Sequence, residues 1–122
     1  NMPRAATDSL SVQLKKGTLA MLVLLLLREE DMYGYQIAVV LDERSNGQLY
    51  VADNSLYGVL YRLSSDGYIS SKKETNVGRP RVFYHLEPKG EAHLQHLIRE
   101  YTAIKDGIEL FFERSKAKEA RE

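Results

Sequence analysis

The chain has 122 residues, of which 43% are hydrophobic, and this is enough for one domain with a modest core and an appendage. Its 17 basic and 17 acidic residues give a formal net charge of zero, so the total charge favours no class of partner. The chain has no cysteine, which excludes a disulfide framework and a metal site built on thiolates.

The first predicted element is a buried helix over residues 14–28. Residues 1–12 are polar and unpatterned, and we expect them to be disordered. Residues 19–27 are nearly all aliphatic and follow Lys15 and Lys16, as in a signal peptide. The run is shorter than the roughly 20 apolar residues that span a membrane, and no small-residue cleavage site follows it. We therefore expect a core helix in a cytoplasmic protein.

A second helix is predicted over residues 32–44, after the acidic turn 29–31. Ile37, Val40 and Leu41 would face inward. Asn46 and Gly47 end this helix, and residues 49–51 could form a short strand. With the helix that follows, it would make a helix-turn-helix unit with a long connection.

The third helix, residues 53–66, has a buried and a polar face. The Asp53 side chain is suited to accept hydrogen bonds from the first N–H groups of the helix. Gly67 is suited to end the helix, because glycine readily adopts the left-handed conformation. The spacing of four apolar residues places them on one face: Leu56, Val59, Leu60 and Leu63. The opposite face carries amide, hydroxyl, phenol and guanidinium groups, which suit base edges and phosphates. Its residues are Asn54, Ser55, Tyr57, Gly58, Tyr61 and Arg62.

A basic β-hairpin is predicted next, with strands 68–75 and 82–87 and a turn over residues 76–81. Arg79 and Arg81 lie beside Pro80 at its tip, and Lys72 and Lys73 lie on the first strand. Residues 54–90 hold six Lys or Arg and three acidic residues. A basic patch on a neutral chain favours a nucleic-acid-binding face, although a hairpin that is merely solvated would have the same charges. A polar-faced helix followed by such a hairpin is the order of a winged helix-turn-helix domain.

The last predicted element is a long helix from Pro88 to about residue 116. Its apolar residues recur at alternating spacings of three and four, like the seam of a coiled coil: Leu94, Leu97, Tyr101, Ile104, Ile108 and Phe111, with Ile98 beside them. A helix of about 43 Å, at about 1.5 Å per residue, is longer than a small winged domain can cover. We therefore predict a homodimer; the alternative is a helix folded back on its own core.

The sequence offers no enzyme chemistry. It has no glycine-rich phosphate loop and no nucleophile motif with partners. His93, His96 and Glu100 could share a helix face, but surface histidines are common and no other ligand cluster supports a site. We expect no catalytic residue, no metal and no cofactor.

In this pattern the chain resembles the PadR family of bacterial transcriptional regulators over nearly all of its length. Tyr33-Gly34-Tyr35-Gln36-Ile37 resembles the family's second-helix signature. The recognition helix and its exit are matched by Ser55-Leu56-Tyr57, Leu60, Arg62-Leu63 and Asp66-Gly67-Tyr68-Ile69. The wing is matched by Gly78-Arg79-Pro80-Arg81, Phe83-Tyr84 and Leu86. The single last helix resembles the small subtype, although Glu87 stands where the family usually has a capping threonine.

The resemblance implies a mainly α fold with a small β-hairpin. Residues 1–87 would form a winged helix-turn-helix DNA-binding domain, and residues 88–122 a C-terminal dimerisation helix. It implies a homodimer on a two-fold symmetric operator, usually a repressor, and often one that a small molecule releases from DNA. The alternative is a winged-helix module that binds protein and no operator. The expected DNA-binding residues are Lys15, Tyr35, Asn54, Ser55, Tyr57, Gly58, Tyr61, Arg62, Lys72, Lys73, Arg79 and Arg81.

Tyr101 has two possible roles. In the multidrug-sensing branch of the PadR family, an aromatic residue near this position lines a flat hydrophobic ligand pore, which would imply a small aromatic or hydrophobic effector. The present chain has no tryptophan, and plain packing in the dimer seam is the role that the pattern favours.

Overall fold

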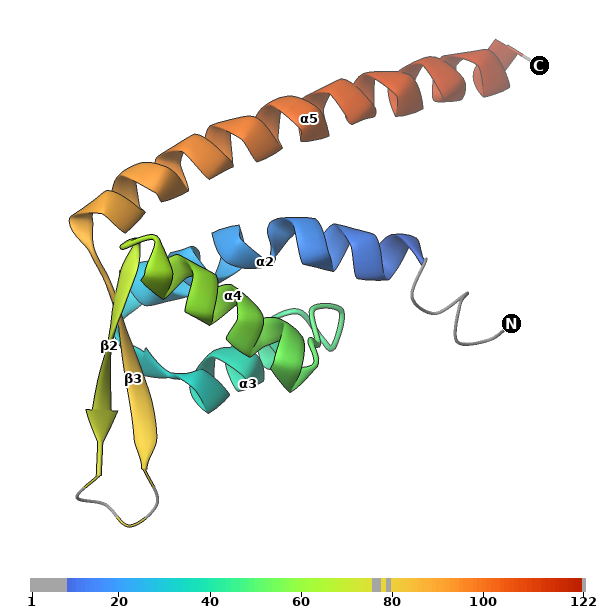
Figure 1. Ribbon diagram of the computed structural model, residues 1–122. Coiled ribbons are helices and arrows are strands. Elements are labelled where there is room, and N and C mark those ends of the chain that lie inside the picture. The colour runs from blue at the N-terminus through green and yellow to red at the C-terminus, as the bar shows by residue number, and fades with distance from the viewer. Residues whose placement is uncertain (1–8, 76–77, 79, 122) are drawn as a thin grey trace.

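The computed structural model describes residues 9–75, 78 and 80–121. The elements in chain order are α2 (Leu10–Glu29), β1 (Met32–Tyr33), α3 (Gly34–Arg44), α4 (Asp53–Ser65), β2 (Ile69–Glu74), β3 (Arg81–Leu86) and α5 (Pro88–Arg121). The strands form one antiparallel sheet in the order β1-β3-β2, and β2 and β3 make the hairpin that projects from the helices in Figure 1. Helices packed beside a projecting hairpin make the predicted winged helix-turn-helix architecture, which is thereby confirmed.

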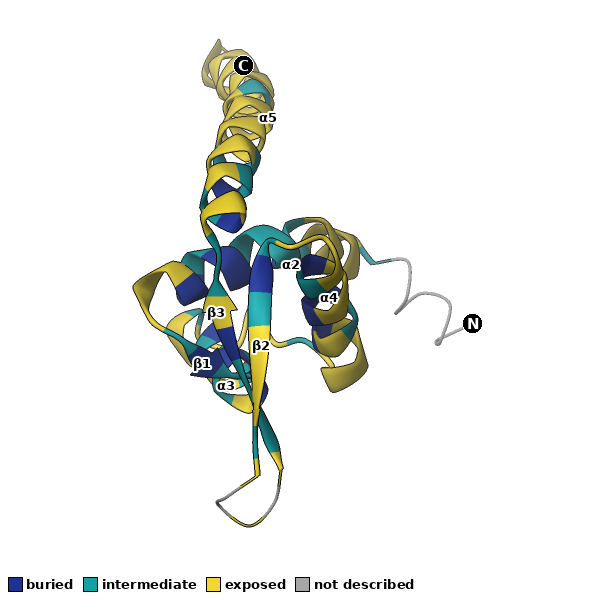
Figure 2. Ribbon diagram, turned by 60° about the vertical axis from the view of Figure 1, so that its left-hand side comes forward, coloured by how far each residue is buried: buried dark blue, intermediate teal, exposed yellow. Residues whose placement is uncertain are grey.

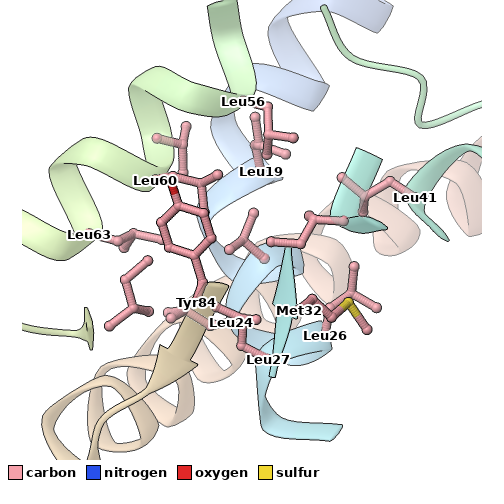
Figure 3. Close-up of a cluster of buried hydrophobic side chains, with 14 of the residues drawn as sticks. Leu19, Leu24, Leu26, Leu27, Met32, Leu41, Leu56, Leu60, Leu63 and Tyr84 are labelled. Carbon is pink, nitrogen blue, oxygen red and sulfur yellow. The ribbon is translucent and has the colours of Figure 1, made fainter. Parts of the chain in front are cut away.

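Helix α2 is the central core element. The Ser9 hydroxyl accepts a hydrogen bond from the Val12 N–H at 3.2 Å, so the helix begins earlier than predicted and includes residues 10–12. Five of its apolar side chains are buried against α3, α4 and the sheet (Figure 3): Leu19, Val23, Leu24, Leu26 and Leu27. By length and composition α2 could cross a membrane. Its burial at the centre of the core instead identifies it as the main packing helix of the fold.

Strand β1 corrects the predicted start of the second helix. Met32 and Tyr33 pair with Tyr84 and Phe83 of β3, so α3 begins only at Gly34. The Gln36 side chain accepts a hydrogen bond from the Tyr33 N–H at 2.8 Å, which satisfies one free donor at this helix end. On the other side of this junction, Asp31 lies 2.7 Å from Nδ1 of His85 on β3, and this hydrogen bond raises the pKa of His85.

Two further boundaries differ from the prediction. Residues 49–51 form no strand; the Ser45 hydroxyl instead accepts a hydrogen bond from the Leu49 N–H at 2.8 Å. Ala52 is the N-cap of α4, and Asp53 is the first helical residue. There its carboxylate still lies at the positive end of the helix dipole. Gly67 has the expected left-handed backbone, with φ of 80°.

Helix α5 belongs partly to the winged domain. Gly90 and Leu94 are buried, and Leu97 and Ile98 pack against the core. The prediction that Leu94 lies in an intermolecular seam is therefore wrong, because this fully buried side chain has no surface left for a second copy. Beyond Ile98 the helix leaves the body of the chain, and its residues are exposed almost throughout (Figure 2).

Glu87, just before α5, has a different role from a side-chain cap. Its carbonyl oxygen accepts hydrogen bonds from the N–H groups of Gly90 and Glu91 at 2.9 and 3.0 Å. Its carboxylate accepts a hydrogen bond from the Ser70 hydroxyl on β2 at 2.6 Å. The carboxylate therefore anchors the helix start to the sheet, and Pro88 occupies the first turn, where no N–H is needed.

Candidate nucleic-acid interface

Helix α4 presents the polar face that the sequence predicts. Leu56, Val59, Leu60 and Leu63 are buried in the core, which fixes the rotation of the helix about its axis. Asn54, Ser55, Tyr57, Tyr61 and Arg62 are exposed, and Gly58 is half-buried between them. Tyr61 is the most prominent of the exposed tyrosines on α4, since 75% of its surface is accessible.

A cleft lies beside α4 on the α2 side, and we name it the lysine cleft. It has a volume of about 560 Å³ and is lined by Val12, Lys15, Lys16, Leu19, Tyr50, Val51, Ala52, Asn54, Ser55, Gly58, Val59 and Arg62. The Lys15 ammonium donates a hydrogen bond to the Tyr50 carbonyl at 2.9 Å, so this side chain is held over the cleft. Three cationic side chains next to Asn54 and Ser55 suit a phosphate beside the edge of a base.

A second cleft, the wing cleft, lies between α4, the start of α3 and the hairpin. It has a volume of about 670 Å³ and is lined by Tyr33, Gly34, Tyr35, Tyr57, Pro80, Arg81 and Val82. Tyr57 comes from the opposite flank of α4 to Ser55 and Arg62. The polar face of α4 therefore lies between two clefts that each contain at least one cationic side chain.

Close packing of α3 on α4 positions Tyr57. A Cβ atom on Gly34 would come within 2.6 Å of the Tyr57 hydroxyl and 2.8 Å of its ring, so only glycine lets the phenol cross the start of α3. A side chain at position 34 would therefore push the Tyr57 ring aside. The contact also shows that Tyr57 is in part a packing residue, although 44% of its surface remains exposed.

The basic side chains of the hairpin differ in their exposure to solvent. Lys72 and Lys73 are exposed on β2. Arg81 is half-buried, with its guanidinium carbon 4.6 Å from the centre of the Tyr33 ring, a cation–π contact. Arg79 lies outside the described residues.

The expected DNA-binding residues include neither Tyr33 nor Glu74, which the fold brings together beside Arg81. The Tyr33 ring stacks on Tyr35 at 5.9 Å between centroids and packs on Phe83 at 4.8 Å. Its hydroxyl donates a hydrogen bond to Glu74, and this bond, together with burial, raises the pKa of Tyr33. In the sequence, Glu74 stands out only as an acidic residue in a basic strand. Its contact with Tyr33 could not be predicted, because the two residues are brought together only by the folded sheet.

The histidines of α5 form no ligand group. The His93 ring stacks on Tyr68 with centroids 4.1 Å apart and planes 2° apart. Within the described residues, no cluster of three His, Asp or Glu could hold a metal ion. His93 is therefore a packing residue between α5 and the sheet.

A groove between α2 and the exposed part of α5 is the third hollow, and we name it the α2–α5 groove. Its volume is about 420 Å³, and its apolar lining includes Leu14, Met21, Leu97, Tyr101, Ile104 and Ile108. Tyr101, Ile104, Ile108 and Phe111 are 43%, 61%, 50% and 80% exposed. These predicted seam residues therefore form a continuous apolar stripe that the described chain leaves in contact with solvent.

Comparison with known proteins places the chain in a family. Residues 23–96 match the transcriptional regulator PadR-like family, and this range runs from the middle of α2 to the first turns of α5. A protein from Lysinibacillus sphaericus is 31% identical over 99 residues, which are 80% of this chain and 91% of that protein.

Solved structures agree with this assignment. A PadR family transcriptional regulator from Eggerthella lenta has a TM-score of 0.78 and 28% identity, over 92% of this chain and 96% of that one. Bacillus subtilis PadR in complex with operator DNA has a TM-score of 0.60 and 22% identity, over 66% of this chain and 46% of that one, and shows the shared fold.

The family and its structural relatives are regulators rather than enzymes, in agreement with the lack of a catalytic motif in the sequence. With a matching winged domain, a polar recognition helix and a basic hairpin, the chain belongs to the PadR-like family of transcriptional regulators.

Proposed function

We propose that this regulator binds a specific operator through α4 and the hairpin, acts as a homodimer in the cytoplasm, and represses transcription. The observation that supports this proposal best is the polar face of α4 between the lysine cleft and the wing cleft. Side chains on such a face can read base edges, while cations on both flanks bind the phosphates that border a groove. The structure of Bacillus subtilis PadR with operator DNA is a precedent for this use of the fold.

The homodimer is proposed from the apolar stripe on α5. Exposed apolar residues recur along about three turns of a helix that has left the body of its own chain. Covering this stripe with the same stripe of a second copy, and with the α2–α5 groove, would remove it from water.

Ligand release is proposed from the same groove. A small aromatic or hydrophobic molecule that entered the α2–α5 groove would contact Tyr101 and compete with the packing of the seam. A change in the packing of the seam would alter the distance between the two α4 helices of the dimer. The two helices would then fit the two half-sites of the operator less well. In the absence of such a molecule, Tyr101 packs between the two copies.

A footprint on the DNA upstream of the coding region tests operator binding. We expect protection of two related half-sites about one helical turn apart, as a two-fold dimer of helix-turn-helix units requires. A repressor role is supported if the protected site overlaps the promoter and if adding the protein lowers transcription in vitro. Absence of any protected site up to the concentration of non-specific binding would favour the protein-interaction alternative.

Asn54 is predicted to read a base rather than a phosphate. Its side chain is exposed on the first turn of α4, beside Ser55 and opposite the buried face. We expect Asn54→Ala to weaken operator binding by about 1–3 kcal/mol if a bidentate contact to a base is lost. Binding to random duplex should stay unchanged in the same fluorescence titration; an equal loss on both duplexes would make Asn54 a backbone contact.

A further inference from the structure

Tyr33 connects all three strands of the sheet. It lies on β1 opposite Phe83 of β3, while Glu74 of β2 lies opposite Arg81 of β3. The Tyr33 side chain reaches across β3, places its ring against the Arg81 guanidinium and donates its hydroxyl hydrogen bond to Glu74. One phenol therefore contacts both members of an oppositely charged cross-strand pair.

Glu74 and Arg81 would be expected to pair with each other. Residues directly opposite on antiparallel strands have Cβ atoms about 5 Å apart, and opposite charges there attract. Among the described residues, however, neither takes part in an ion pair. The carboxylate is bound by the Tyr33 hydroxyl, and the guanidinium lies on the Tyr33 ring at the edge of the wing cleft.

The position of Arg81 matters because of its neighbours. The wing cleft brings its guanidinium together with the phenols of Tyr35 and Tyr57, which are 52% and 44% exposed. A guanidinium forms strong, charge-assisted hydrogen bonds to phosphate, and phenol hydroxyls can add neutral ones. A carboxylate paired with Arg81 would neutralise this cation and repel the phosphate.

We propose that Tyr33 is a positioning residue that holds Glu74 away from Arg81, so that Arg81 can bind a phosphate of the DNA backbone in the wing cleft. This inference rests on the proposed DNA-binding function. Tyr33 itself contacts Glu74 and Arg81 and acts on DNA through them. Its ring provides the platform, and its hydroxyl removes the competing anion.

Four variants separate this role from simple packing. Tyr33→Phe keeps the ring and releases Glu74, which can then pair with Arg81. Glu74→Gln removes the competing charge but keeps an oxygen that the Tyr33 hydroxyl can reach. The double variant has neither the hydroxyl nor the carboxylate. Tyr68→Phe is a matched control, because the Tyr68 ring stacks on His93 at the base of the hairpin and does not line the wing cleft.

The measurement is fluorescence anisotropy of a labelled random-sequence duplex at several salt concentrations, since a phosphate contact needs no operator. We expect Tyr33→Phe to bind more weakly and to lower the slope of log K against log salt by about 0.9 per bound copy. Glu74→Gln should bind at least as tightly as the wild type. The double variant should recover the wild-type slope, and Tyr68→Phe should match the wild type.

Other results overturn the inference. If the double variant is as weak as Tyr33→Phe, the hydroxyl acts by stabilising the hairpin and not by holding the carboxylate. If Tyr33→Phe equals the wild type while the wild type binds with a steep salt dependence, the positioning role is wrong and the DNA-binding function stands. If the wild type does not bind duplex DNA, the proposed function fails first.

Discussion

We expect Gly90→Ala to unfold at a clearly lower urea concentration than the wild type. A Cβ atom at this position would lie 2.0 Å from the Tyr68 carbonyl oxygen and 2.9 Å from its carbon. These are backbone atoms, and that oxygen also accepts a hydrogen bond from the Glu87 N–H at 3.0 Å. Overpacking of this kind destabilises by about 1–3 kcal/mol or more, and here the start of α5 must move off the sheet.

Gly107→Ala is the matched control on the same helix. A Cβ atom at Gly107 would meet nothing within 4 Å in the single chain. We expect this change to stabilise the single chain by up to about 1 kcal/mol, since alanine favours the helix. Urea denaturation followed by circular dichroism, at equal protein concentrations, measures both. An unaltered midpoint for Gly90→Ala would mean that α5 does not pack on the sheet as described.

The second large effect is expected for the paired change Ile104→Glu and Ile108→Glu. Both side chains are at least half-exposed in the single chain, four residues apart on one face of α5. In a symmetric seam the substitutions would bury four like charges against one another, which is strongly unfavourable. Sedimentation velocity should show a dimer for the wild type and a monomer for the double variant.

Leu110→Glu is the control for this seam. Leu110 is 65% exposed on the same helix, and it lies about 200° around the axis from Ile108, since each residue turns the helix by about 100°. We expect this variant to remain a dimer. If the Ile104→Glu and Ile108→Glu double variant sediments as a dimer with an unchanged dissociation constant, the seam is wrong. If Leu110→Glu also dissociates, the interface extends around α5 beyond the stripe.

Local patterns in the sequence were sufficient for the elements that position the site. The four buried leucine and valine residues of α4 have helical spacing, and their burial leaves Asn54 and Tyr61 on the outside. Gly67 and Pro88 are at the helix end and helix start that their backbone preferences predict. These features depend on neighbours within one or two turns, which is why they could be read directly.

Contacts between distant residues could not be read in this way. The spacing of Leu94 is the same for a helix packed on its own core and for a helix packed on a partner, and only the fold shows that it is buried in the single chain. Strand β1 has two residues, and its conformation depends on pairing with β3 about fifty residues later in the chain. The contact of Tyr33 with Glu74 spans 41 residues and depends on both pairings in the sheet.

Equilibrium binding of the wild-type protein to duplex DNA at several salt concentrations tests the central claim most directly. The lysine cleft and the wing cleft supply Lys15, Lys16, Arg62 and Arg81, and β2 adds Lys72 and Lys73. If most of these bind phosphates in each copy, log K should fall linearly with log salt, with a slope of about −0.9 for each phosphate and several phosphates per copy. Binding that is absent, or whose strength does not change with salt, would contradict a DNA-binding role for α4 and the hairpin.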